Sequence, residues 1–125
     1  MTEHFADHEL VSPDTGQHSM DADFMAQIEE LRTEYGKAMI LTSAYRTPEH
    51  NAQVSSTGAN GPHTTGRAVD VLVSGADAFD LIELAIEIGF TGIGIKQSGP
   101  HNKRFVHIDN LTEADGYPRP RVWTY

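Results

Sequence analysis

Two stretches of the chain carry apolar residues at helical spacing. Apolar residues of the first stretch are Phe24, Ile28, Leu31 and Tyr35, a pattern that predicts an amphipathic helix. Asp21 or Asp23 can cap the start of this helix, and Gly36 fits its end. The second stretch, residues 74–90, predicts another amphipathic helix, with an inner face formed by Phe79, Ile82, Ala85, Ile86 and Gly89.

Four short segments are rich in β-forming residues and predict strands: 38–46, 67–73, 91–96 and 104–110. A short helix is expected over 47–56, because proline is accepted in a first helical turn. The tail 117–125 holds two prolines and the only tryptophan of the chain, and we expect it to fold back over the sheet. This order of elements predicts an α+β fold with a mainly antiparallel sheet and helices packed on one face.

Length and composition point to one globular domain over residues 1–125. A chain of 125 residues has the size of a single domain, and no repeat or linker divides it. Its 38% hydrophobic and 22% charged residues are typical of a soluble globular protein. It contains no cysteine, which excludes disulfides and thiolate metal sites. We expect a monomer.

The net charge of the chain and the composition of residues 1–10 indicate which partners and which cellular location to expect for the protein. The formal net charge of −9 repels phosphate backbones and anionic lipid, so we expect neither nucleic acid nor membrane as a partner. Residues 1–10 lack the basic start and apolar stretch of a signal peptide. We therefore expect the protein to be made in the cytoplasm.

Asp70 is the first candidate for chemistry, because it stands in a predicted strand that is otherwise apolar. Since side chains alternate along a strand, Asp70 shares its face with Ala68 and Leu72. A buried carboxylate needs a counter-charge or hydrogen bonds, and without them it takes up a proton. A structural explanation is an ion pair with Arg67 or Arg46.

Two histidines favour a functional interpretation of Asp70. His107 lies inside the apolar segment FVHID, and His63 stands seven residues before Asp70. Two neutral imidazoles and one carboxylate are a common ligand set for catalytic zinc, with the fourth position left for water. Gly66 and Ala68 would then keep bulk away from the metal where the loop enters the strand.

The segments around these residues resemble one known family. HTTGRAVD (63–70) matches the H-x-x-G-x-A-x-D pattern of the zinc D-alanyl-D-alanine carboxypeptidases and phage L-alanyl-D-glutamate endopeptidases, which share their fold with the hedgehog signalling domain. The resemblance includes TSAYRTPEHN upstream and GFTGIGI and RFVHID downstream, and covers residues 38–110. It implies His63, Asp70 and His107 as Zn²⁺ ligands. It also implies that Arg46 holds a substrate carboxylate or the developing oxyanion, although Arg46 can instead be a structural partner of an acid.

Two positions depart from the family pattern. The family's serine two residues before the first histidine is Gly61, a change that we expect to affect loop hydrogen bonding and not metal binding. Many members carry a glutamate or aspartate three residues before the last histidine as general base. Arg104 occupies that position here, and an arginine cannot take up a proton.

Two residues are candidates for the missing base. Asp109 follows His107 by two residues in the same strand, so both side chains face the metal side. We rank Asp109 first, although it can instead orient a ligand histidine. His101, in the turn SGPHNKR, is the second candidate, because a mobile loop can bring an imidazole over a cleft.

The resemblance implies a zinc metallopeptidase that hydrolyses a bond in the stem peptide of bacterial peptidoglycan, of carboxypeptidase or endopeptidase type. A small domain without a signal peptide suits a phage or prophage endolysin, or a virion-associated lysin, that reaches the cell wall through other phage components. The alternative is a non-catalytic zinc module of the same fold, used for binding or assembly. Arg104 in the usual position of the base favours this alternative.

Overall fold

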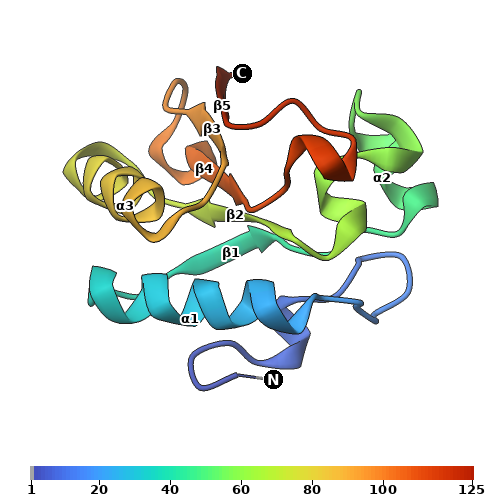
Figure 1. Cartoon of the computed structure of the whole chain (residues 1–125), viewed down its shortest axis with the longest axis horizontal. Coiled ribbons are helices and arrows are strands. Elements are labelled where there is room, and N and C mark those ends of the chain that lie inside the picture. Colours follow the sequence, from blue (N-terminus) through green and yellow to red (C-terminus); the bar gives the residue numbers. More distant parts are fainter. Residues whose placement is uncertain (1) are drawn as a thin grey trace.

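The computed structural model describes residues 2–125 and confirms the predicted α+β class (Figure 1). Its α-helices are α1 (Ala22–Tyr35), α2 (Pro48–Val54) and α3 (Gly75–Ile88). Its strands are β1 (Ile40–Ser43), β2 (Ala68–Leu72), β3 (Gly92–Lys96), β4 (Phe105–Asp109) and β5 (Arg121–Thr124). Within residues 2–125, no helix has the length and apolar character needed to cross a bilayer.

The five strands form one sheet in the order β1-β2-β4-β3-β5. All neighbouring strands are antiparallel except β3 and β5, which are parallel. We expected the tail 117–125 to fold back over the sheet, and this expectation is partly wrong. The backbone of the tail does not cover the sheet but extends it as edge strand β5. Only side chains of β5, Trp123 among them, reach across the face of the neighbouring strands.

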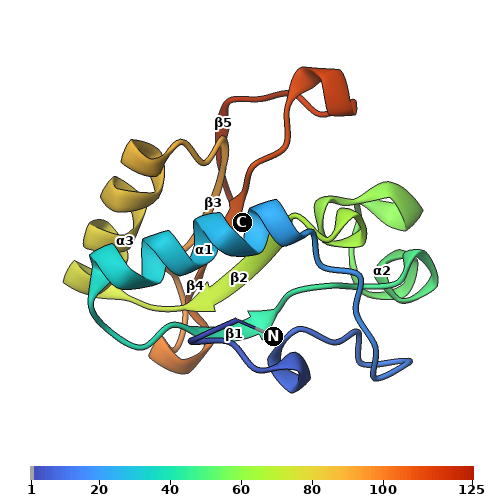
Figure 2. The same ribbon diagram turned by 60° about the horizontal axis from the view of Figure 1, so that its bottom comes forward.

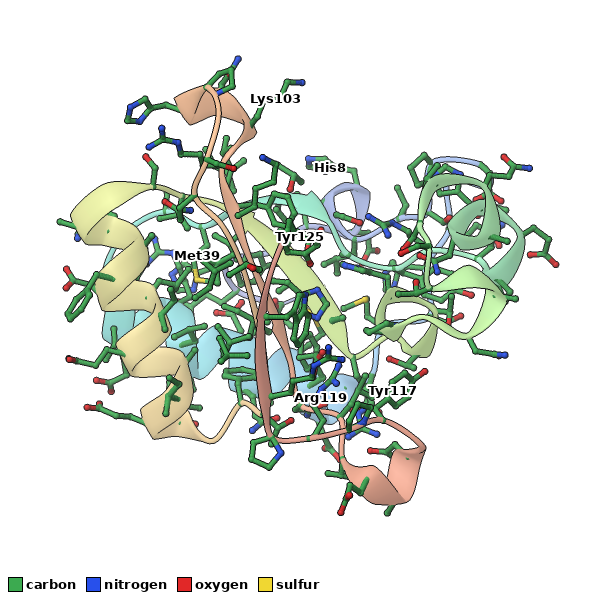
Figure 3. The ribbon with its side chains drawn as sticks, turned by 90° about the horizontal axis from the view of Figure 1, so that it is seen from above. His8, Met39, Lys103, Tyr117, Arg119 and Tyr125 are labelled. Atoms are coloured by element: carbon green, nitrogen blue, oxygen red, sulfur yellow. The ribbon has the colours of Figure 1, made fainter. Side chains whose placement is uncertain are left out.

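The two faces of the sheet have different chemistry, as strand alternation requires. Buried apolar side chains occupy one face: Val69, Val71, Ile93, Val106 and Ile108. Helices α1 and α3 contact each other on that side, and Figure 2 shows α1 crossing the strands. The opposite face, seen in Figure 3 with α1 behind the strands, carries Asp70, His107 and Asp109. The core therefore supports one face and leaves the other for polar groups.

Helix α1 begins and ends at the residues that the sequence predicts. The side chain of Asp21 accepts a hydrogen bond from the backbone N–H of Phe24 at 2.9 Å. Gly36 ends the helix with φ of 71°, a left-handed conformation that glycine adopts without steric cost. The predicted apolar positions of α1 are all buried, so both its boundaries and its inner face are confirmed.

The predicted inner face of α3 is wrong at three positions. Phe79 and Ile86 are 69% and 59% exposed, and Gly89 forms the exposed C-cap. The buried residues of α3 are Ala78, Leu81 and Ala85. Apolar residues occur on more than one side of this helix, so spacing alone does not select a face. The buried side is the one that packs against α1 and β4.

Candidate metal centre

Three polar side chains meet on the open face of the sheet. Asp70 and His107 are direct partners in the β2–β4 register, so their side chains project side by side. His63 belongs to the 3₁₀ turn η3 (Pro62–Thr65), which precedes β2 and returns over it. All three side chains are buried. The seven-residue spacing between His63 and Asp70 therefore covers the end of η3, the link through Gly66 and the start of β2.

Asp70 Oδ1 lies between the two imidazoles. It is 3.3 Å from His63 Nε2 and 3.1 Å from His107 Nδ1. The two rings meet edge to face, with centroids 5.1 Å apart. One ligand atom from each of the three residues lies within 4.8 Å of the others. This is a compact N,N,O donor set of the kind that binds zinc in three-ligand sites.

The second nitrogen of each imidazole is fixed by an acceptor outside this group. His63 Nδ1 lies 2.7 Å from the carbonyl oxygen of Ala44 and must donate to it, because a carbonyl only accepts. His107 Nε2 lies 2.7 Å from Asp109 Oδ2 and likewise donates to the carboxylate. The nitrogens that face Asp70 then carry lone pairs. Three lone pairs at these distances repel unless a proton or a cation stands among them, so the residues fit a metal.

The protonation preferences of the group agree with this geometry. Burial acts to raise the pKa of Asp70, but the charges and hydrogen bonds of His63 and His107 outweigh burial and hold that pKa below its ordinary value. Burial acts to lower the pKa of His107, yet hydrogen bonds to Asp109 and Asp70 outweigh it and raise that pKa. Asp70 is therefore ionised, as a ligand must be, and a metal competes with a proton on His107.

Asp109 is fully buried beside His107, across the ring from Asp70. Arg119 grips its carboxylate with two hydrogen bonds, from Nε to Oδ1 at 3.0 Å and from Nη2 to Oδ2 at 2.8 Å. The backbone N–H of Leu111 donates to Oδ1 at 3.2 Å. Burial acts to raise the pKa of Asp109, but His107 and Arg119 outweigh it and lower that pKa to about 2. Both oxygens of Asp109 are thus engaged.

A cavity of about 720 Å³ opens over the three converging side chains. One wall comes from the loop between α2 and η3, and the other comes from residues 117–125 (Figure 3). Asp70 is the only acidic residue among the described residues that line it, whereas Arg46, Arg119 and Arg121 are cationic. In a chain of net charge −9, this local excess of arginine suits a ligand that carries a carboxylate.

Comparison with known protein families supports this interpretation of the site. The model of a family described as Peptidase M15 matches residues 3–109. The chain belongs to the peptidase M15 family. This confirms the resemblance found in the sequence, and M15 members are metal-dependent peptidases. The comparison with curated proteins gave no match. The family match ends at Asp109, so β5 lies beyond the matched region.

Arg46 enters this M15 site from the segment that follows β1. Its Nη1 donates to Asn51 Oδ1 at 3.0 Å, whereas its Nη2 is 3.9 Å from Asp70 Oδ2. The buried amide of Asn51 donates to Thr57 Oγ1 at 2.9 Å and to the carbonyl of Gly58. Arg46 is therefore aligned mainly by Asn51, and its contact with Asp70 is loose.

Gly61, which stands where the resemblance led us to expect a serine, makes room for this network. A Cβ at Gly61 would stand 2.1 Å from Thr57 Oγ1 and 2.6 Å from Asn51 Nδ2. A side chain at this position would displace the pair that aligns Arg46. The absence of a side chain at Gly61 thus accompanies the hydrogen bond between Asn51 and Thr57.

Two residues discussed in connection with the base lie away from the cavity: His101, the second candidate, and Arg104, which stands where the resemblance expects the base. His101 begins the exposed turn η4 (His101–Lys103), and its Nδ1 is 3.3 Å from Ser74 Oγ. Figure 3 places Lys103, in the same turn, at the far end of the strands from Arg119. Arg104 Nε donates to the carbonyl of Gly99 at 2.9 Å. Neither His101 nor Arg104 is among the residues that line the cavity.

Gly66, the glycine of the H-x-x-G segment, is required for a reason other than room for a metal. Its φ is 74°, and a Cβ there would lie 2.0 Å from the carbonyl oxygen of Ser19. The backbone N–H of Asp21 also donates to the carbonyl of Gly66 at 2.9 Å. The expected role is therefore corrected: Gly66 lets the chain before α1 pack against the turn that carries His63.

Several residues that shape the site were missed in the sequence: Asn51, Arg119 and Tyr125. Trp123 was expected in a tail over the sheet but not as a residue of the site. Trp123 lies over His107 with ring centroids 5.0 Å apart, and Tyr125 lines the cavity. The two prolines that punctuate 117–125 concealed a strand, and no local pattern signals that this tail reaches His107.

Proposed function

We propose that this M15 peptidase is a zinc enzyme that hydrolyses a peptide bond in the stem peptide of bacterial peptidoglycan. The observation that carries the proposal is the convergence of His63, Asp70 and His107 at a 720 Å³ cavity. These three residues would hold the Zn²⁺ ion through Nε2, a carboxylate oxygen and Nδ1. Zinc in such a site acts as a Lewis acid, which acidifies water and polarises a carbonyl group.

The protein's own groups would keep the ligands in the correct tautomer. The carbonyl of Ala44 holds the Nδ1 proton of His63, and Asp109 holds the Nε2 proton of His107. Ligand histidines that are anchored in this way lose less freedom on binding and are more basic. We assign this orienting role to Asp109, because its engaged oxygens and its low pKa make it a weak proton acceptor.

Arg46 would bind a carboxylate of the substrate. Asn51 engages Nη1 of Arg46 while Nη2 is only loosely placed near Asp70, so the guanidinium can still offer donors to the cavity. A planar guanidinium binds a carboxylate with two parallel hydrogen bonds. A substrate carboxylate would suit a cavity in which Arg46 and Arg121 lack the bidentate pair that commits Arg119 to Asp109.

A non-catalytic zinc module is the second candidate function, and the composition of the cavity favours it. Apart from the three proposed ligands, the described lining residues offer no carboxylate or imidazole side chain. A hydrolase normally uses such a group to accept a proton from water. His101, the remaining candidate for that role, would have to move from its contact with Ser74.

Digestion of purified cell walls separates the two functions. The zinc-loaded protein is incubated with peptidoglycan sacculi, and the released fragments are identified by mass spectrometry. Release of D-alanine supports a carboxypeptidase, and cleavage between L-alanine and D-glutamate supports an endopeptidase. Zinc-dependent binding to sacculi without new fragments supports the non-catalytic module. The setting in a phage or virion-associated lysin stays a prediction from the sequence, and assays on walls of different bacteria define its target.

A further inference from the structure

The segment 117–125 lies beyond the matched M15 region and yet reaches the centre of the site. Its Arg119 side chain is only 4% exposed, although arginine is rarely buried. The guanidinium lies over the rings of Tyr117 and Trp123, at 5.7 and 5.1 Å from their centroids. Figure 3 shows Arg119 and Tyr117 close together at one side of the strands. A buried, stacked arginine needs a specific partner.

That partner is Asp109, which Arg119 holds in bidentate geometry. Asp109 in turn accepts the Nε2 proton of His107 at 2.7 Å, and His107 Nδ1 faces Asp70. A continuous chain of contacts therefore runs from Arg119 through Asp109 to the imidazole. If Arg119 were removed, the buried carboxylate of Asp109 would lose two of its hydrogen bonds and could reorient. That change would release the Nε2 anchor of His107.

A glycine of the sheet makes room for a second contact from the same segment. Gly94 pairs with His107 on one side and with Trp123 on the other. A Cβ on Gly94 would stand 2.6 Å from Trp123 Nε1. The missing side chain lets the indole lie across β3 and against His107, at 5.0 Å between ring centroids. Residues 117–125 thus hold His107 through Asp109 and through Trp123.

We propose that Arg119 is a positioning residue of the metal centre. It fixes Asp109, and through Asp109 it fixes the ring of His107 with Nδ1 turned toward Asp70. The last segment of the described chain is then part of the metal site and not a peripheral strand. This inference rests on the proposed binding of zinc by His63, Asp70 and His107.

Metal affinity tests the proposal without any assay of hydrolysis. Zn²⁺ binding is measured by competition with a chelating indicator for the wild-type protein, Arg119→Gln and Arg119→Lys. Trp123, the only tryptophan, lies against His107 and reports the same titration through its fluorescence. We expect Arg119→Gln to weaken zinc binding by about 10- to 100-fold, the usual effect of losing a partner of a metal ligand. Arg119→Lys keeps the charge but loses the planar fork, so we expect an intermediate loss.

Arg67→Gln is the matched control. Arg67 donates to Asn110 Oδ1 at 2.8 Å and pairs with Asp115 at 3.1 Å, so it anchors the stretch that leads into 117–125 and has no hydrogen bond or ion pair with His107 or Asp109. We expect this variant to bind zinc like the wild type. The absorption spectrum of the Co²⁺-loaded protein should change in Arg119→Gln and not in Arg67→Gln, because it reports ligand geometry.

The outcomes separate this proposal from the one on which it rests. Wild-type affinity and an unchanged cobalt spectrum in both Arg119 variants would overturn the role of Arg119 and leave the zinc site standing. Equal losses in Arg119→Gln and Arg67→Gln would also overturn it, because they would reflect general loosening of the segment. Failure of the wild-type protein to bind zinc would instead refute the proposed metal centre. If Arg119→Gln does not fold, the zinc affinity and cobalt spectrum of Arg119→Lys are compared with those of the wild type and of Arg67→Gln instead.

Discussion

The carbonyl oxygen of Ser19 lies 2.0 Å from the point where a Cβ of Gly66 would stand. The peptide before α1 therefore crosses directly over the turn that carries His63. Gly66 also has φ of 74°, in the region that disfavours other residues. Two separate constraints, a steric one and a conformational one, thus require glycine at this position.

We expect Gly66→Ala to lower the free energy of unfolding by about 3 kcal/mol. The backbone at Ser19 must move away from the new Cβ, and the alanine must also adopt a left-handed conformation. Gly36→Ala is the control, since Gly36 has φ of 71° but no atom within 4 Å of its added Cβ. That variant should lose only about 1 kcal/mol, the conformational cost alone. Thermal and denaturant unfolding give both values, and equal losses would show that the contact with Ser19 is unimportant.

The metal ligands give the second prediction. The protein should bind about one Zn²⁺ per chain, as expected of a three-ligand site with a fourth position for water. His63→Ala and His107→Ala should each lose most of the metal, because two remaining protein ligands hold zinc poorly. His101→Ala is the control, since His101 does not line the cavity. Elemental analysis of purified proteins measures the content, and full occupancy in both ligand variants would refute the assignment.

We predict that Arg46 contributes to substrate binding more than to the stability of the fold. Arg46→Lys retains the charge but not the planar fork. We expect kcat/KM on muropeptides to fall by about 10- to 100-fold, because a hydrogen bond to a charged group contributes about 1.5–3 kcal/mol. Zinc content and melting temperature should stay close to those of the wild type, because the contact with Asp70 is long. A large loss of thermal stability with normal turnover per folded molecule would assign Arg46 to the structure.

Asp109→Asn distinguishes the two roles considered for this residue. If Asp109 orients His107, the variant should bind zinc about 10- to 100-fold more weakly, and excess zinc should restore hydrolysis. If Asp109 is the general base, zinc binding should persist while turnover falls by about 10²-fold or more. The buried pair with Arg119 favours the first result. The measurement is a zinc titration of turnover, with His101→Ala assayed in parallel.

The sequence predicted local features well because short-range physics determines them. Asp21 and Gly36 have the chemistry of a helix start and end, and the structure uses both. Alternation along β2 and β4 placed Asp70 and His107 on the face where the structure brings them together. Such inferences need only the residues within a few positions of one another.

Features that depend on contacts distant in the sequence escaped prediction. Alternation put Asp109 on the same face as His107, but it gives no sign of which side of the imidazole the carboxylate would lie on. That is set together with Arg119, in a tail whose prolines concealed a strand. Likewise, the buried side of α3 is selected by its packing against the rest of the core, and the apolar pattern of the helix alone pointed to Phe79 and Ile86.

The position of the last strand has a practical consequence for handling the protein. Tyr125 lines the cavity, and Figure 1 shows the C-terminal end on the side of the sheet away from α1 and the N-terminal end. Residues attached after Tyr125 would begin at the cavity wall. An oligohistidine purification tag placed there would supply imidazoles beside His63 and His107, and it would compete for the same ion. A tag at the other end starts on the opposite side, away from the cavity, and it is removed before metal titrations because its imidazoles bind zinc wherever they are attached.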